Sequence, residues 1–281
     1  MKTGYAAATI TVLIWGITFV STKLLLNTFT PVEILFIRFA IGTIALFVIS
    51  PHILRSKGWN EEKYFIAAGI SGIFLYYFLE NISLIWTSAS NTGVIVSTAP
   101  FFTALFSKEK KSKWFFIGFA SAIIGILLMS FSALEVSQSS LLGDFLSLGA
   151  AAVWGVYAIL TKKISTFGYS EIQTTRRSFL YGLVFISIAM LFWHGYGDER
   201  NILTASNILN LAFLGIMASA LCFVLWNIAV RQIGAIKTSV FIYLVPVVTV
   251  ISSALFLDEP ITLSSGAGTL LTLLGLVIST K

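Results

Sequence analysis

Ten long apolar stretches, separated by short polar connections, constrain this chain more than any other feature. A helix that crosses a lipid bilayer needs roughly 20 consecutive, mostly apolar residues. The pattern predicts ten such helices, and no connection is long enough to fold as a soluble domain. The predicted spans are residues 5–27, 31–50, 63–86, 90–107, 113–131, 143–164, 171–193, 208–231, 235–257 and 261–280.

Charge content supports lipid as the solvent of this chain. Only 11% of the 281 residues are charged, whereas a soluble domain contains about 25%. The net charge of +6 does not indicate a nucleic-acid partner, because the basic residues form short clusters between apolar runs. The single cysteine, Cys222, excludes an intrachain disulfide.

The basic residues fall mainly in alternate connections. Lysine and arginine concentrate in the cytoplasmic loops of membrane proteins. The second, fourth, sixth and eighth connections, with their flanks, carry Arg55, Lys57, Lys108, Lys110, Lys111, Lys162, Lys163, Arg231 and Lys237, whereas the odd connections carry only Arg200. This asymmetry predicts a multi-pass protein of the inner (plasma) membrane with both termini in the cytoplasm.

The first five spans resemble the last five in sequence. Offsets of 139 and 146 residues align Trp15-Gly16 with Trp154-Gly155, Lys23 with Lys162, Arg38 with Arg177, Asn81 with Asn227 and Pro100 with Pro246. Because five is an odd number of spans, the halves 1–134 and 135–281 would cross the membrane in opposite senses. Inverted repeats of this kind are a transporter architecture with substrate held near the midplane. We therefore predict an all-α integral membrane fold of two inverted five-helix repeats around a central cavity.

Short ordered motifs in these spans resemble a known family. They are Ile14-Trp15-Gly16, Ile37-Arg38-Phe39, Val153-Trp154-Gly155, Tyr243-Leu244-Val245-Pro246 and the ending Asp258-Glu259-Pro260 of span nine. Over nearly its whole length the chain resembles the ten-span EamA-type branch of the drug/metabolite transporter superfamily. The resemblance implies two packed five-helix bundles, alternating access, and export or exchange of small metabolites, most often amino acids. Span four departs from the pattern, because it reaches its charged end about one turn earlier than span nine.

Two prolines inside spans point to a substrate site. A proline within a helix removes a backbone hydrogen bond and opens or kinks the helix. Pro100 lies about 15 Å into span four at 1.5 Å per residue, and Pro246 lies at a similar depth in span nine. A simple packing kink is the alternative for each of them.

Aromatic and amide side chains gather on the spans that would face the cavity. Trp15 and Phe19 share a helix face, as do Tyr76 and Glu80. Such a lining suits a ligand with an apolar body and one or two polar groups, although aromatic residues near helix ends also serve as interfacial anchors. The predicted lining comprises Trp15, Phe19, Tyr76, Asn81, Ser97, Pro100, Trp154, Tyr157, Trp226, Asn227, Tyr243 and Pro246.

Charged residues inside spans are costly and therefore informative. Glu80, Lys23 and Arg38 lie near the predicted extracellular ends of spans three, one and two. We hypothesise that Glu80 pairs with Lys23 or Arg38 as an outer gate. The repeat supplies Lys162 and Arg177 on the inner side, where Trp226 aligns with Glu80. Three alternatives stay open: Lys23 snorkels to the headgroups, Arg38 and Arg177 cap neighbouring backbone carbonyls, or Glu80 carries a coupling proton.

The sequence contains no catalytic constellation, nucleotide-binding loop or metal-ligand spacing. We therefore predict no enzyme activity, cofactor or metal. The expected function is secondary transport of a small molecule such as an amino acid, with protons as candidate coupling partners. The alternatives are efflux of toxic cations by proton antiport, and an integral-membrane enzyme or scaffold. One chain would suffice as a monomer, and a dimer is compatible with the pattern.

Overall fold

The computed structural model describes residues 2–107, 112–134, 139–192 and 202–279, and their regular structure is helical. The basic residues Lys108, Lys110, Lys111 and Arg200 lie outside these ranges. In chain order the elements are α1 (Lys2–Leu25), α2 (Pro31–Ile49), α3 (Trp59–Ala68), η1 (Gly69–Leu75), α4 (Tyr76–Trp86), α5 (Ala89–Val96), α6 (Ala99–Phe106), α7 (Lys113–Leu134), α8 (Ser139–Ile164), η2 (Ser165–Phe167), α9 (Glu171–Phe192), α10 (Ala205–Ala212), η4 (Phe213–Leu221), α11 (Cys222–Ile233), α12 (Ala235–Val240), η5 (Phe241–Leu244), α13 (Val245–Phe256) and α14 (Leu263–Ser279).

Seven of the predicted spans are helices long and apolar enough to cross a membrane. They are spans one, two, three, six, seven, eight and nine, found as Lys2–Leu25, Pro31–Ile49, Trp59–Trp86, Leu141–Phe167, Glu171–Phe192, Ala205–Ile233 and Ala235–Phe256. Span four is divided into α5 and α6. Spans five and ten correspond to α7 and α14, within which the apolar stretches Lys113–Gly125 and Gly266–Gly275 are shorter.

Local sequence explains where several helices begin and end. Thr30 caps α2 in a capping box, because its hydroxyl accepts a bond from the Glu33 backbone while its own N–H donates to Glu33 Oε2 at 2.7 Å. The Ser88 hydroxyl caps α5 by accepting from the Asn91 N–H at 3.0 Å. Gly234 separates α11 from α12 with φ of 86°, a backbone conformation that favours glycine.

Four spans are irregular near their middles. The helix of span four is interrupted between Val96 and Ala99, and Pro100 stands in the first turn of α6. In span nine the 3₁₀ turn η5 precedes α13, whose first turn contains Pro246. Both predicted proline openings are therefore found. Spans three and eight contain the π-helical stretches η1 and η4, an irregularity that is frequent at functional sites.

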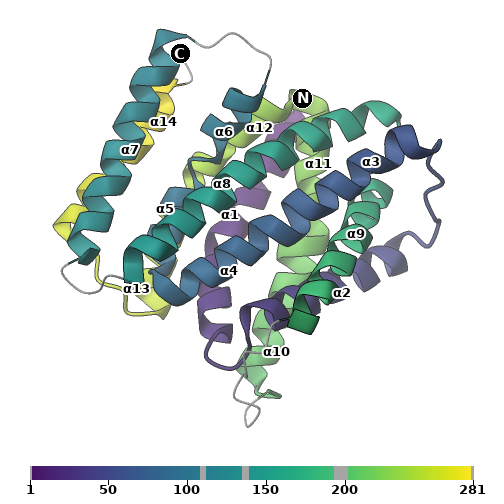
Figure 1. Cartoon of the computed structure of the whole chain (residues 1–281), viewed down its shortest axis with the longest axis horizontal. Helices are drawn as coiled ribbons and strands as arrows, with labels where there is room; N and C mark the ends of the chain where they lie inside the picture. The colour runs from purple at the N-terminus through teal and green to yellow at the C-terminus, as the bar shows by residue number, and fades with distance from the viewer. Residues whose placement is uncertain (1, 108–111, 135–138, 193–201, 280–281) are drawn as a thin grey trace.

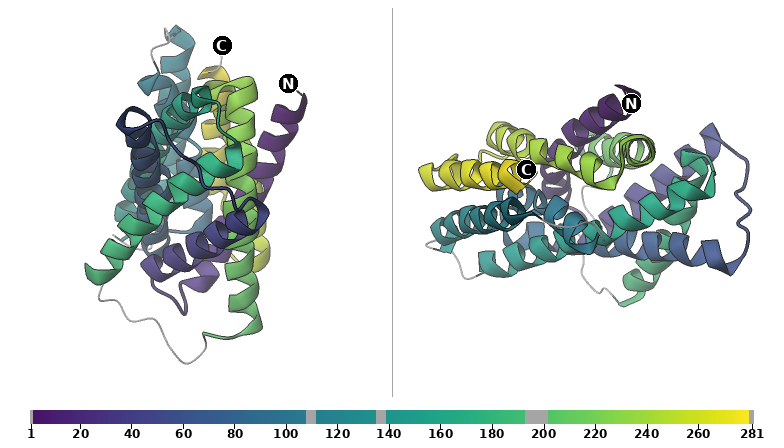
Figure 2. Two further views of the ribbon diagram at one scale, coloured as in Figure 1. Left: turned by 90° about the vertical axis from the view of Figure 1, so that its right-hand side faces the viewer. Right: turned by 90° about the horizontal axis from the view of Figure 1, so that it is seen from above.

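Helices α7 and α14 lie side by side at one edge of the molecule (Figures 1 and 2). Glycine permits this close contact, since a Cβ on Gly125 would lie 2.6 Å from the carbonyl oxygen of Gly268. Gly275 faces the backbone of α7 in the same way. Gly118 and Gly125 of α7 thus pack against Gly268 and Gly275 of α14, whereas Gly266 makes no such contact. The start of α1 and the end of α14 lie at the same end of the molecule (Figures 1 and 2).

Candidate functional site

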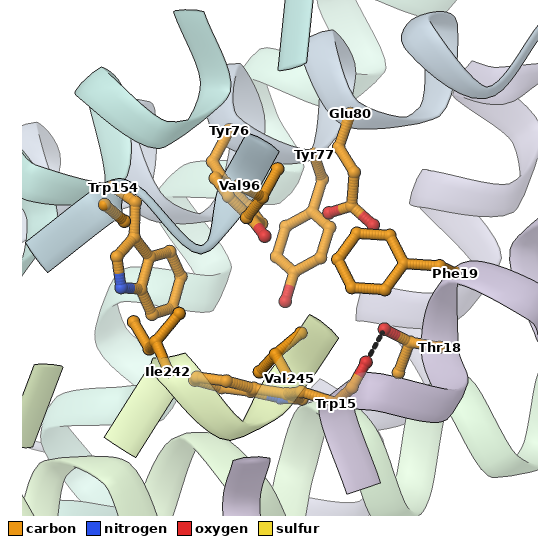
Figure 3. A pocket seen from close by; sticks show the side chains of 11 residues that line it. Trp15, Thr18, Phe19, Tyr76, Tyr77, Glu80, Val96, Trp154, Ile242 and Val245 are labelled. Carbon is orange, nitrogen blue, oxygen red and sulfur yellow. Dashed lines mark hydrogen bonds between the residues drawn. The ribbon is translucent and has the colours of Figure 1, made fainter. Parts of the chain in front are cut away.

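A pocket lies where the two interrupted spans face spans one, three and six (Figure 3). The empty space in and around it, solvent at its mouth included, is about 390 Å³. Its walls are mainly aromatic and aliphatic, with one carboxylate among them. Its lining residues are Trp15, Thr18, Phe19, Tyr76, Tyr77, Glu80, Val96, Ala99, Trp154, Ile242 and Val245.

The helix interruptions of spans four and nine supply one side of this pocket. Val96 and Ala99 flank the break between α5 and α6, while Ile242 and Val245 lie just before Pro246. The prolines themselves are not part of the lining. Their effect is to end one helical segment and begin the next, which turns the neighbouring side chains toward the cavity.

Tightly packed rings form much of the remaining wall. Trp15 meets Trp154 edge to face, with ring centroids 5.1 Å apart, and Tyr76 lies 4.8 Å from Trp154. The Trp15 indole N–H donates to the carbonyl oxygen of Ala218 at 2.9 Å, within the π-helical stretch of span eight. Edge-to-face and tilted ring pairs of this kind stabilise by about 0.5–1.5 kcal/mol beyond their buried area. The aromatic walls are therefore held in fixed positions by their own contacts.

Glu80 is the charged side chain of the lining. It is 1% exposed, and neither carboxylate oxygen has a hydrogen-bond partner among the described residues. The Tyr76 hydroxyl lies beside the carboxylate, outside hydrogen-bonding geometry. Figure 3 shows the carboxylate at the edge of the pocket, next to the rings of Tyr77 and Phe19. A buried carboxylate without a partner is energetically costly, which makes Glu80 a candidate functional residue.

Arg38 lies behind the pocket wall and is also 1% exposed. Its Nε–H donates to the Ser219 hydroxyl at 2.7 Å, and an Nη2–H donates to the Tyr77 hydroxyl at 3.2 Å. The guanidinium carbon stacks over the Tyr77 ring at 4.1 Å from its centroid. Arg38 therefore bonds to spans three and eight, and the hypothesised ion pair with Glu80 is not formed.

Lys23 likewise forms no ion pair with Glu80. Its ammonium donates to the carbonyl oxygens of Leu84 and, at 2.9 Å, Thr87, where α4 ends. At the same end of the bundle, Glu259 accepts bonds from the Ala89 and Ser90 backbone N–H groups at 2.9 and 3.1 Å. These contacts join the end of span one to that of span three, and the end of span nine to the start of span four, one to two helical turns beyond Glu80.

At the far end of span three, acidic and basic side chains do form pairs. Arg177 pairs with Glu62 at 2.7 Å, while the Arg176 guanidinium donates to the carbonyl oxygens of Ser50 and His52. Tyr169 donates to Glu61 at 2.6 Å, and this bond raises the pKa of Tyr169.

The contacts of Gly69 and Gly215 do not follow the alignment of Arg38 with Arg177 and match a register shifted by one residue. The carbonyl oxygen of Arg38 faces Gly215, and its structural counterpart facing Gly69 is the carbonyl oxygen of Ser178. Arg177 is therefore part of a peripheral ion pair rather than the counterpart of the buried Arg38. Lys162, aligned with Lys23, is exposed.

The predicted lining divides into three groups. Trp15, Phe19, Tyr76 and Trp154 form pocket wall. Tyr157 and Trp226 lie directly behind it, with centroids 4.9 and 5.7 Å from the Trp154 ring. The remaining predicted residues are elsewhere: Asn81 donates to the Pro31 carbonyl at 3.0 Å, Asn227 lines a second pocket of about 330 Å³ beside Tyr169, Tyr243 belongs to a cluster with Phe101 and Phe115, and Ser97, Pro100 and Pro246 border the helix breaks.

Sequence reasoning did not single out Thr18, Tyr77, Val96, Ala99, Ile242 and Val245 as lining. Thr18 follows Trp15 by three residues, so helical periodicity could have placed it on the same face. The aliphatic members carry no signal of their own in an apolar chain. Among the described residues, no group of three histidine, cysteine, aspartate or glutamate side chains could hold a metal ion.

Comparison with known proteins gives a consistent result. The sequence profile of the EamA-like transporter family matches residues 2–131 and 141–281. An uncharacterised transporter of Archaeoglobus fulgidus is 26% identical over 277 residues, covering 96% of this chain and 95% of the relative. The uncharacterised transporter YyaM of Bacillus subtilis is 28% identical, covering 93% and 88% of the two chains.

Two further similarities concern function and fold. A probable terminal-alkyne amino-acid exporter of Streptantibioticus cattleyicolor is 24% identical, covering 93% of this chain and 89% of the relative. A solved crystal structure superposes with a TM-score of 0.73 at 15% identity, covering 99% of this chain and 97% of the other. At that identity the superposition establishes the shared fold.

Proposed function

Because the chain belongs to the EamA-like transporter family, we propose that it is a secondary transporter that moves a small metabolite by alternating access. The observation that carries this proposal is the pocket bounded by the interrupted spans four and nine. Irregular backbone at membrane depth is tolerated where it is buried in protein or lines a cavity. The breaks beside Pro100 and Pro246 meet that condition.

We further propose ten membrane crossings arranged as two inverted repeats, residues 1–134 and 135–281. Equivalent contacts in the two halves support this arrangement. A Cβ on Gly16 would lie 2.7 Å from Val248 Cγ1, and a Cβ on Gly155 would lie 2.7 Å from Phe102 Cβ. The family profile also matches two stretches, one in each half. Alternating access would then move one set of helices against the other around the pocket.

The proposed orientation places both termini in the cytoplasm of a cell whose inner (plasma) membrane holds the protein. The concentration of lysine and arginine in the even connections supports it. In this orientation the contacts of Lys23 and Glu259 lie on the extracellular side and act as an outer gate. The ion pair of Arg177 and Glu62 lies on the cytoplasmic side.

An amino acid or a related compound is the proposed substrate, and export the proposed direction. The aromatic walls suit an apolar side chain, and the similarity to an amino-acid exporter supports the class. A second candidate, efflux of organic cations by proton antiport, is favoured by one observation: the buried Glu80 carboxylate is unpaired. Amino acids and amine-type organic cations, the solutes of these two candidate functions, both carry an ammonium group.

Counterflow in proteoliposomes tests the proposal. Purified protein, reconstituted alone, should exchange one class of labelled amino acids or amines without altering it chemically, with and without an imposed pH gradient. Ala99→Phe should abolish this exchange, because Ala99 is fully buried in the pocket lining and the larger ring fills the space.

The matched control is Ala120→Phe, which places the same ring on an exposed position of α7. It should exchange solute as the parent protein does. Size-exclusion profiles of both variants establish that each is folded. Exchange unaffected by Ala99→Phe would remove the pocket from the pathway, and chemical conversion of a solute would indicate an enzyme instead.

A further inference from the structure

The cations nearest to the pocket are already bound to other groups. The Lys23 ammonium is held by the carbonyl oxygens of Leu84 and Thr87. Arg38 is held by Ser219 and Tyr77 through Nε and Nη2, while its Nη1 has no hydrogen-bond partner among the described residues. Glu80 is left without a bond to either, although it is 1% exposed. A buried carboxylate in this state is stabilised either by taking up a proton or by pairing with a cation that enters the pocket from outside.

The surroundings of Glu80 indicate what kind of cation fits. A divalent metal ion requires several oxygen ligands, and Glu80 is the carboxylate of a lining otherwise made of Thr18 and aromatic or aliphatic residues. The faces of tryptophan and tyrosine rings attract ammonium groups within about 6 Å of the ring centre. Tyr77 and Phe19 lie beside the carboxylate in Figure 3, and Trp15 and Trp154 complete the walls.

We infer that Glu80 is the residue that recognises the ammonium group of the transported solute, with the aromatic walls holding its apolar body. The solute class is thereby narrowed to ammonium compounds with an apolar body, α-amino acids included. This inference rests on the proposed transport function and adds a specificity-determining residue to it. The asymmetry of the two halves supports the assignment, because Trp226 aligned with Glu80 offers no second carboxylate.

The test compares three phenyl-bearing probes that carry different charged groups. Phenylalanine carries both an ammonium and a carboxylate, phenethylamine carries the ammonium alone, and N-acetylphenylalanine carries the carboxylate alone. Calorimetric titration of the purified full-length protein should show binding of the first two, with N-acetylphenylalanine at least tenfold weaker. Glu80→Gln, which keeps the shape of the side chain, should weaken binding of phenethylamine at least tenfold.

The matched control is Glu61→Gln, which removes a carboxylate from the same span about 28 Å away at 1.5 Å per residue and from outside the pocket lining. It should bind all probes as the parent protein does. Equal binding of amine and acetylated probe, or unchanged amine binding by Glu80→Gln, overturns the inference. Unchanged amine binding together with altered pH-driven counterflow would assign Glu80 to proton coupling instead.

The outcomes also separate this inference from the transport proposal. Counterflow of some solute by a protein that ignores every ammonium probe would overturn the role of Glu80 and leave transport standing. Folded protein that moves no solute of any class would contradict transport itself.

Discussion

Span three and span eight each contain a π-helical stretch, Gly69–Leu75 in the first and Phe213–Leu221 in the second. In each stretch a glycine packs against the backbone of a neighbouring span. A Cβ on Gly69 would lie 2.7 Å from the carbonyl oxygen of Ser178, and one on Gly215 would lie 3.2 Å from that of Arg38. Farther along, the two spans differ, because span three carries Glu80 where span eight carries Trp226.

The comparison of Glu80 with Trp226 distinguishes residues that shape the backbone of a span from residues available to contact a solute. Both spans follow the same irregular path, so the path itself does not require a charge. Tyr76, Tyr77 and Glu80 of span three all line the pocket, whereas Cys222, Phe223 and Trp226 of span eight are buried behind it. Span three thus places polar side chains in the pocket lining, whereas the side chains of span eight pack behind the aromatic wall and support it.

The largest effect is expected from the two glycines themselves. Alanine at either position would place a Cβ within 2.7 Å of atoms in a neighbouring span. Overpacking of this kind costs about 1–3 kcal/mol of stability. Gly69→Ala and Gly215→Ala should both lower the thermal unfolding midpoint of the purified protein in detergent.

Gly266→Ala is the matched control, because nothing lies within 4 Å of a Cβ at that helical position. It should leave the midpoint unchanged or raise it, since alanine favours helix over glycine by about 1 kcal/mol. If only one of the two π-stretch variants is destabilised, the packing of spans three and eight is not equivalent.

An intermediate effect is expected where Arg38 joins the two spans. Ser219→Ala leaves the buried Nε–H without its 2.7 Å partner, which costs about 1–3 kcal/mol. Tyr77→Phe removes a longer bond of 3.2 Å and keeps the ring over the guanidinium. We expect Ser219→Ala to lower the unfolding midpoint more, and Tyr77→Phe to change solute affinity more, because Tyr77 lines the pocket.

Unfolding scans and solute titrations on both variants measure the two quantities separately. A Tyr77→Phe protein with parental solute affinity and a lowered unfolding midpoint would contradict the view that span three contacts the solute while span eight supports the wall. So would a Ser219→Ala protein that is fully stable.

The sequence predicts features of the local backbone better than it predicts which side chains pair. Apolar length located the seven membrane-length helices among the described residues, and the two prolines located the helix breaks, because both signals act through the local backbone. Glu80 stood out because a carboxylate in an apolar run is rare. Its partner was predicted wrongly, since sequence shows which charges share an end of the bundle but not which backbone carbonyls compete for Lys23.

Repeat alignment had a related weakness. The arginines of spans two and seven match at an offset of 139 residues, but the packed residues match at 140, which pairs Phe39 with Phe179 and Gly42 with Gly182. The rings of Phe39 and Phe179 are in contact, 4.9 Å apart. A surface arginine is free to vary in position, whereas a glycine at a close contact is not, so the small residues are the better guide to register.

The smallest effect is expected from the aligned lysines, Lys23 and Lys162. Lys23→Met removes a charged donor from two carbonyl oxygens at the end of α4, while Lys162 is exposed. Because Lys23 is half-buried, we expect Lys23→Met to lower the free energy of unfolding by about 1 kcal/mol, which is less than the loss of a fully buried hydrogen bond to a charged group. If these contacts close the extracellular end, Lys23→Met should also make that end more accessible to a thiol reagent at Thr18→Cys, reacted in a Cys222→Ala background. Lys162→Met should change neither stability nor labelling. Equal labelling of the two lysine variants would show that this end of the bundle is closed by the contacts of Glu259 with span four and not by Lys23.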